Sequence, residues 1–136
     1  MDFRSRFAFL ILVLVQAMHS VEEYVFKLYD VFGPARFVSG VVSDDLPTGF
    51  AVVNIGLVAL GFWCYLARVR TAHVSARLWV WPWVVVEGAN GIGHSVIALE
   101  RGEYFTGVMT APLLLAMSLY LGIRLMRAGR GWPAAV

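Results

Sequence analysis

The stretch QAMHSVEE, residues 16–23, places a histidine and two glutamates inside an otherwise apolar segment that begins at Phe7. On a helix, His19, Glu22 and Glu23 stand at positions i, i+3 and i+4, so their side chains project from one face. Ionisable groups at membrane depth cost free energy and mark functional sites. The stretch therefore predicts a helix whose polar face meets partners from other helices at the same depth.

The composition is that of a membrane protein with several spans. The chain has 136 residues, of which 60% are hydrophobic and 15% charged, and its mean hydropathy is +0.72. We expect one compact domain over residues 1–136. Cys64 is the only cysteine in the sequence, which excludes an intrachain disulfide and a C-x-x-C motif. The net charge of +2 does not indicate nucleic acid, because the basic residues flank apolar segments and act as topology determinants.

Four apolar segments have about the twenty residues that a membrane-spanning helix requires. They cover residues 7–26, 48–67, 78–99 and 104–125. They predict an all-α fold, a polytopic four-helix bundle in the membrane. Residues 27–47 mix turn formers with aromatic residues and predict a connection that lies against the membrane surface. A cleaved signal peptide is the alternative for the first segment, but residues 16–20 offer a poor cleavage site, so we expect the segment to be retained.

The distribution of Lys and Arg predicts that both termini are cytoplasmic. Of the 11 basic residues, Lys27, Arg36 and Arg101 lie on one side of the expected membrane, and the remaining eight (11 − 3) lie on the other. In multi-pass proteins the side with more Lys and Arg faces the cytoplasm.

The third predicted span carries a second polar stripe. Glu87, Asn90 and His94 stand at positions i, i+3 and i+7 and share one face of that helix. Because the first and third spans run in the same direction, His94 is expected at the depth of His19, and Glu87 near the middle of the membrane. The two polar stripes are therefore expected to face each other inside the bundle.

Smaller polar groups lie in the outer halves of the other spans. Asn54 on the second span, and Thr106 and Thr110 on the fourth, are expected to close the site, with Asn54 and Asn90 as candidates for cofactor binding. The glycine-rich face of the third span permits close helix approach and is a possible contact for a second copy of the chain, a homo-oligomer.

Two imidazoles and several carboxylates favour a divalent transition metal, zinc or iron. We expect His19, Glu22, Glu23 and His94 to bind the metal or to perform acid/base chemistry, and Glu87 to act deeper as a buried base. A haem between the two histidines is less favoured, because nearby glutamates suit so apolar a cofactor poorly.

The motif His19-Ser20-Val21-Glu22-Glu23, followed by Asn90 and His94, resembles the HXXEE family of small bacterial membrane proteins. Residues 104–107, YFTG, are similar to that family's Tyr-x-x-Gly segment, although Thr106 stands where the family pattern has proline. The resemblance covers most of the chain. It implies the same site residues and a bacterial cytoplasmic membrane, and it leaves the reaction open.

Three classes of function follow from these observations. The leading hypothesis is a membrane-embedded enzyme, metal-dependent or acid/base, that acts on a lipid or isoprenoid-like substrate. Its metal-free form resembles the emopamil-binding sterol isomerases, which also place His and Glu in a small helical bundle. The alternatives are a non-enzymatic metal or haem-binding module or small carrier, and an assembly protein. The polar residues can also simply hold the helices together.

Overall fold

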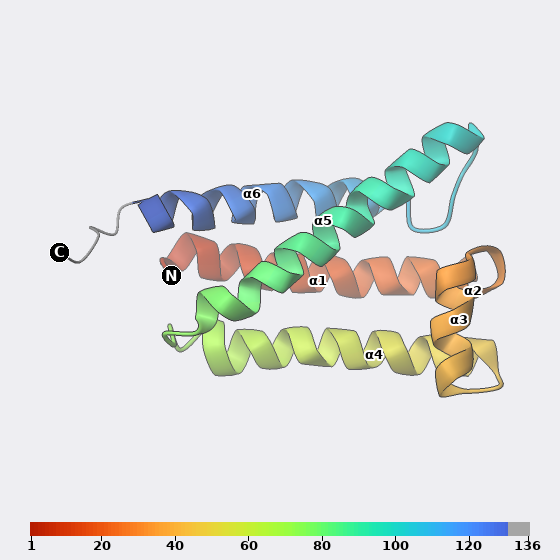
Figure 1. Cartoon of the computed structure of the whole chain (residues 1–136), viewed down its shortest axis with the longest axis horizontal. Helices are drawn as coiled ribbons and strands as arrows, with labels where there is room; N and C mark the ends of the chain where they lie inside the picture. The colour runs from red at the N-terminus through yellow and green to blue at the C-terminus, as the bar shows by residue number, and fades with distance from the viewer. Residues whose placement is uncertain (131–136) are drawn as a thin grey trace.

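The computed structural model describes residues 1–130, and within them every regular element is helical (Figure 1). This confirms the predicted all-α fold. The elements are α1 (Phe3–Val25), α2 (Leu28–Val31), α3 (Gly33–Val42), α4 (Leu46–Cys64), a π-helical continuation η1 (Tyr65–Val69), α5 (Ala76–Arg101) and α6 (Ala111–Arg130). Asp2 and Asp45 cap α1 and α4, because each carboxylate accepts a hydrogen bond from a backbone amide three residues later.

Within residues 1–130, three helical segments are long and apolar enough to cross a membrane: Phe3–Val25, Leu46–Val69 and Ala111–Ala128. The chain is therefore a multi-pass membrane protein by length and composition. Helix α5 is longer than any of them, with 26 residues, but it does not join this set. Its polar residues Glu87, Asn90 and His94 lower its hydropathy. The membrane crossing of α5, and with it the four-span bundle and its orientation, stays a prediction.

The predicted start of the fourth span at Tyr104 is wrong, because α6 begins only at Ala111. Residues 104–110 form a non-helical loop in which Gly107 has φ of +91°. A positive φ interrupts a right-handed helix, and Pro112 then favours a helix start by occupying its first turn. The connection over residues 27–47 contains the two short helices α2 and α3.

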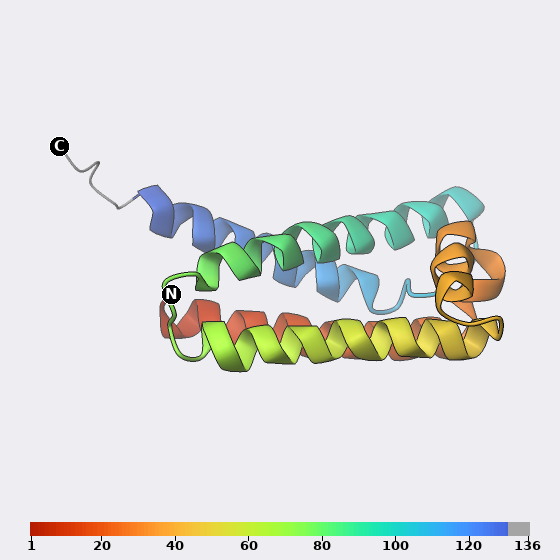
Figure 2. The same cartoon turned by 60° about the horizontal axis from the view of Figure 1, so that its bottom comes forward.

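The long helices are arranged around α1 (Figures 1 and 2). Helix α1 lies between α4 and α6, α5 crosses the bundle obliquely and packs chiefly on α6, and α2 and α3 cover one end. Helix α1 begins at the end of the bundle where α6 terminates, and there Asp2 pairs with Arg124. At the same end, the Arg6 guanidinium donates a hydrogen bond to the Arg70 carbonyl oxygen, at 3.1 Å.

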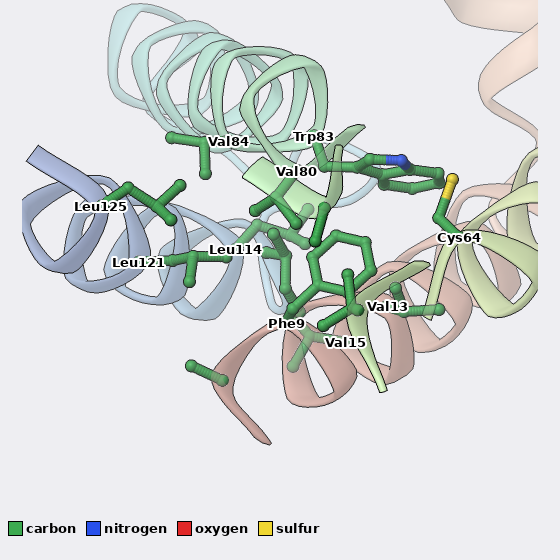
Figure 3. Packing of buried hydrophobic residues seen from close by; sticks show 14 residues of the cluster. Phe9, Val13, Val15, Cys64, Val80, Trp83, Val84, Leu114, Leu121 and Leu125 are labelled. Atoms are coloured by element: carbon green, nitrogen blue, oxygen red, sulfur yellow. The ribbon is translucent and has the colours of Figure 1, made fainter. Parts of the chain in front are cut away.

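The apolar core fills the half of the bundle nearest the start of α1. Figure 3 shows its side chains from close by. Phe9 contacts the Trp83 ring edge to face, with ring centroids 6.1 Å apart, and Val80, Leu114 and Leu121 pack around them. Lipid chains are as apolar as these side chains, so the helices are held by close van der Waals packing. In the other half of the bundle, the sides of α1, α5 and α6 that face the interior carry polar residues. The site lies there.

Glycines set how closely the helices approach. A Cβ atom at Gly91 of α5 would lie 2.8 Å from the Ala111 carbonyl oxygen and 2.8 Å from the Leu115 nitrogen of α6. Part of the predicted small-residue face is therefore used within the chain, between α5 and α6. Gly93 faces open space, with nothing within 4 Å of its would-be Cβ.

Candidate functional site

Three buried side chains from two helices converge on one point. Glu23 Oε1 lies 3.2 Å from Nε2 of His19, one turn earlier on α1, and 3.1 Å from Nε2 of His94 on α5. One donor atom from each of the three residues lies within 4.8 Å of the others. The two imidazoles meet edge to face, with ring centroids 4.8 Å apart. The first and third predicted spans thus meet at His19 and His94, which helix geometry predicts to lie at the same depth.

The hydrogen bond at His94 Nδ1 determines where that ring carries its proton. This nitrogen lies 2.5 Å from the Thr106 carbonyl oxygen. A carbonyl oxygen can only accept, so His94 Nδ1 must be the donor. A neutral His94 therefore presents an unprotonated Nε2 to Glu23.

Glu22 is not part of this group of three and is held by the 104–110 loop. Its Oε1 accepts hydrogen bonds from the Tyr104 hydroxyl at 2.8 Å and from the Met109 amide at 3.0 Å. Its Oε2 accepts from the Thr110 amide at 3.0 Å and from the Thr110 hydroxyl at 2.6 Å. Four donors occupy the carboxylate, which is the arrangement that an ionised carboxyl group favours.

The same network sets the tautomer of His19. The Thr110 hydroxyl has one proton, and it is donated to Glu22 over 2.6 Å, a shorter contact than the 3.4 Å to the Gly107 carbonyl oxygen. Thr110 Oγ1 must then accept from His19 Nδ1, which lies 2.7 Å away. A neutral His19 therefore also presents an unprotonated Nε2, and this buried atom has no aligned hydrogen-bond partner.

Two nitrogen lone pairs and one carboxylate oxygen repel one another unless a proton or a metal ion lies among them. Protons on the imidazoles, a proton on Glu23 or a metal ion meets this requirement. The spacings of 3.1 and 3.2 Å between Glu23 Oε1 and the two Nε2 atoms suit a metal. Ligands about 2.1 Å from a tetrahedral zinc lie about 3.4 Å from one another.

Gly107 lets the loop pass against both histidines. A Cβ atom there would lie 2.6 Å from His94 Nδ1 and 2.7 Å from His19 Cε1. Its φ of +91° is a conformation that residues with a side chain rarely adopt. The site therefore needs glycine at position 107 for two reasons: the positive φ, and the lack of space for a side chain beside the two imidazoles.

Glu87 lies apart from the three convergent residues. Its side chain is completely buried, and neither carboxylate oxygen has a hydrogen-bond partner. Gln16 Oε1 and Ser118 Oγ are also buried without a partner. Polar atoms without partners in an apolar interior are unusual and point to bound water or a proton-carrying role.

The two asparagines have different surroundings. Asn54 joins α4 to α1, because its Oδ1 accepts from the Ser20 hydroxyl at 2.8 Å, and its amide donates to the Phe50 carbonyl oxygen at 3.0 Å. Asn90 is half-buried, and both asparagines line a cavity that also exposes Glu23 and His94.

The 104–110 loop contacts Glu22 and both histidines, and most of these contacts could not be predicted from the order of the residues. The Met109 amide leaves no signature in the sequence, and Tyr104 and Gly107 entered only through the family resemblance. Burial, together with the hydrogen bond to Glu22, raises the pKa of Tyr104 to about 12. The phenol therefore stays a donor at neutral pH. Its contribution to folding is complete below the ordinary tyrosine pKa of 10.0 and is lost as the pH rises through about 12.

Comparisons with known proteins give a partial similarity. The chain is 32% identical over 83 residues to proteins named phosphatidate cytidylyltransferase from Brucella abortus (strain 2308), Brucella suis biovar 1 (strain 1330) and Brucella melitensis biotype 1. The match covers 61% of this chain but 27% of each relative, so the chain spans about a quarter of their length. No family model matches the chain, and no solved structure matches it significantly.

Proposed function

We propose that the protein is a membrane-embedded enzyme in which His19, Glu23 and His94 hold a divalent transition metal, zinc or iron. The observation that carries the proposal is that both imidazoles donate through Nδ1, whereas both Nε2 atoms converge on Glu23 Oε1. Two histidines and one carboxylate form a donor set that proteins use for catalytic zinc and for non-haem iron, with further positions open to substrate.

The residues around the donors support this assignment. Metal-binding histidines usually donate their second ring nitrogen to an oxygen, and this fixes the ring and raises its basicity. Here Thr106 and Thr110 provide those oxygens, and Glu22 orients the Thr110 hydroxyl. Glu22, included among the ligand candidates from the sequence, is thus a positioning residue in this proposal.

The chemistry proposed is attack on, or proton transfer at, an oxygen-bearing group of a lipid or isoprenoid-like substrate. A bound metal supplies Lewis acidity toward a substrate oxygen. Glu87, without a hydrogen-bond partner, is suited to accept a proton beneath the donors. The apolar helices and the partial similarity to a lipid-modifying enzyme support a lipid substrate in a bacterial cytoplasmic membrane. The distribution of Lys and Arg supports an orientation with both termini on the cytoplasmic side.

A metal-free acid/base enzyme is the second candidate. Glu23 Oε1 is close enough to both Nε2 atoms to pair with protonated imidazoles. A haem fits less well, because Glu23 Oε1 lies between the two nitrogens that would be its axial ligands. We therefore expect purified protein to be free of the haem Soret absorption.

Metal analysis of detergent-purified protein tests the proposal. We expect about one zinc or iron per chain, and less than about half of that in His19→Ala and in His94→Ala, because each variant loses one of three ligands. His73→Ala is the matched control, since His73 is exposed in the α4–α5 connection and contacts Ser75.

Unchanged metal content in both site variants would overturn shared coordination. Wild-type protein that stays metal-free after growth and dialysis with zinc and with iron would exclude the metal enzyme. The acid/base candidate would then be the better description.

A further inference from the structure

A cavity opens beside the metal ligands between α3, α4 and α5. Its volume is about 500 Å³, within the range of sites that hold small molecules. The walls are mainly apolar and include Phe32 and Val38 from the α2–α3 region, Val53 from α4 and Val86 from α5. This cavity, called the α4–α5 groove below, exists because α5 packs on α6 and hardly touches α4.

Five polar side chains line the α4–α5 groove, and three of them, Glu23, Asn90 and His94, belong to the site or lie beside it. The other two, Ser39 and Asn54, already have hydrogen-bond partners within the chain. A molecule in the groove would thus lie with an apolar part along α4 and α5 and a polar part beside the metal ligands. That is the amphipathic pattern of a membrane lipid.

The charges favour a substrate whose polar end is uncharged. Among the residues that the structure describes, no Lys or Arg lines the groove, so a phosphate there would have no cationic side chain from them as partner. Glu23 lines the groove, and its carboxylate would repel a phosphate placed beside it. A hydroxyl group carries no charge and avoids this repulsion.

Helix α3 places one side of the groove at a surface suited to the membrane. Phe37, Val41 and Val42 of α3 are exposed, while Ala35 and Val38 line the groove. A short helix with exposed apolar residues at the end of a membrane bundle is suited to lie in the interfacial region. A lipid can then enter sideways from the outer hydrocarbon layer without crossing water.

We infer that the α4–α5 groove binds the hydrocarbon chain of a single-chain lipid alcohol and presents its hydroxyl to Asn90 and the metal ligands. The inference rests on the proposed function for the role of the hydroxyl. The position of the hydrocarbon chain depends only on the size and the apolar walls of the groove.

Photolabelling in phosphatidylcholine nanodiscs tests this inference. The probe is hexadecanol with a diazirine in mid-chain, and labelled peptides are mapped by mass spectrometry. We expect label on α4 and α5 at the groove, and a decrease of about fivefold or more in Val53→Trp, because the indole fills the space of the chain. Val86→Trp approaches from the opposite wall and is expected to give the same result.

Ile55→Trp is the matched control. Ile55 lies on the same helix but lines a different apolar cavity, between α1 and α4, with Ala17 and Val58. We expect groove labelling and metal content to match wild type in this variant. Metal content should also be unchanged in Val53→Trp and Val86→Trp, which checks that the centre is intact.

Equal groove labelling in wild type and in both groove variants would overturn the inference, as would label confined to the Ile55 cavity. If unlabelled phosphatidate competes as strongly as hexadecanol, the inference that the bound lipid has an uncharged polar group is wrong. Loss of label in the groove variants of a protein without metal would support the chain site and would refute only the proposed metal function.

Discussion

Gly107→Ala is expected to abolish metal binding while leaving every proposed ligand in the sequence. The new Cβ would lie 2.6 Å from His94 Nδ1 and 2.7 Å from His19 Cε1, so both imidazoles must move. The loop cannot retreat freely, because the neighbouring Met109 and Thr110 amides are bonded to Glu22. Since lost support of ligands alone weakens metal binding by about 10–100-fold, displacement of two ligands should exceed about 100-fold.

Gly102→Ala separates the steric effect from the backbone effect. Gly102 also has a positive φ, +63°, but nothing lies within 4 Å of its would-be Cβ. Alanine in the left-handed region costs about 1–2 kcal/mol at Gly102. The backbone cost at Gly107 is at least as large, because its φ of +91° lies beyond that region. Only Gly107→Ala adds the clash, so only that variant should lose metal.

Competition titration with a zinc chelator and thermal unfolding in detergent measure the two effects. If Gly107→Ala binds zinc within about threefold of wild type, the packing of the loop against the histidines does not control the centre. If Gly102→Ala loses zinc equally, backbone strain and not contact with the imidazoles is responsible.

The positions of the convergent residues follow from helix geometry and could be predicted. His19 and Glu23 are one turn apart on α1, and counting residues from the ends of two co-directional helices places His94 at their depth. The same periodicity separates Glu87 from His94 by about two turns, and the structure leaves Glu87 outside the group of three. Regular secondary structure thus makes the spacing of side chains on one helix predictable.

The different roles of Glu22 and Glu23 could not be predicted from the sequence. Both glutamates lie on the same side of α1, and only the path of the 104–110 loop decides which one receives its amides. Apolar composition predicted a helix from Tyr104, whereas Gly107 and Pro112 make the chain fold back before α6. A turn defined by one positive φ and by contacts from distant residues has little local signal.

The oblique path of α5 could not be predicted from the sequence either. Its glycines predicted close packing of some kind, but only the structure identifies α6 as the partner at Gly91. That choice draws α5 away from α4 and opens the groove beside Glu23 and His94. The cavity is therefore a consequence of how one helix crosses another, which depends on shape complementarity along both helices.

Glu22→Ala is expected to destabilise the fold by about 3–5 kcal/mol, the largest stability effect among the single substitutions considered. The change removes the acceptor of four hydrogen bonds and leaves the Met109 and Thr110 amides without partners. These hydrogen bonds are part-buried, and each donor left unsatisfied away from water costs about 1–3 kcal/mol. Thermal and denaturant unfolding in detergent measure the loss, with the exposed loop residue Glu103→Ala as the matched control.

Glu22→Gln tests whether the charge of this residue, and not only its shape, organises the loop. A glutamine has one acceptor oxygen, so its amide nitrogen would face donors that the carboxylate accepts. The pKa of Tyr104 should fall from about 12 toward its ordinary value, visible as tyrosinate absorbance at lower pH and assigned by its loss in Tyr104→Phe. The Thr110 hydroxyl would no longer be committed to Glu22, so His19 could change tautomer and zinc affinity should fall about tenfold or more. Wild-type zinc affinity together with an unchanged Tyr104 titration in Glu22→Gln would refute the chain of hydrogen bonds from Glu22 through Thr110 to His19.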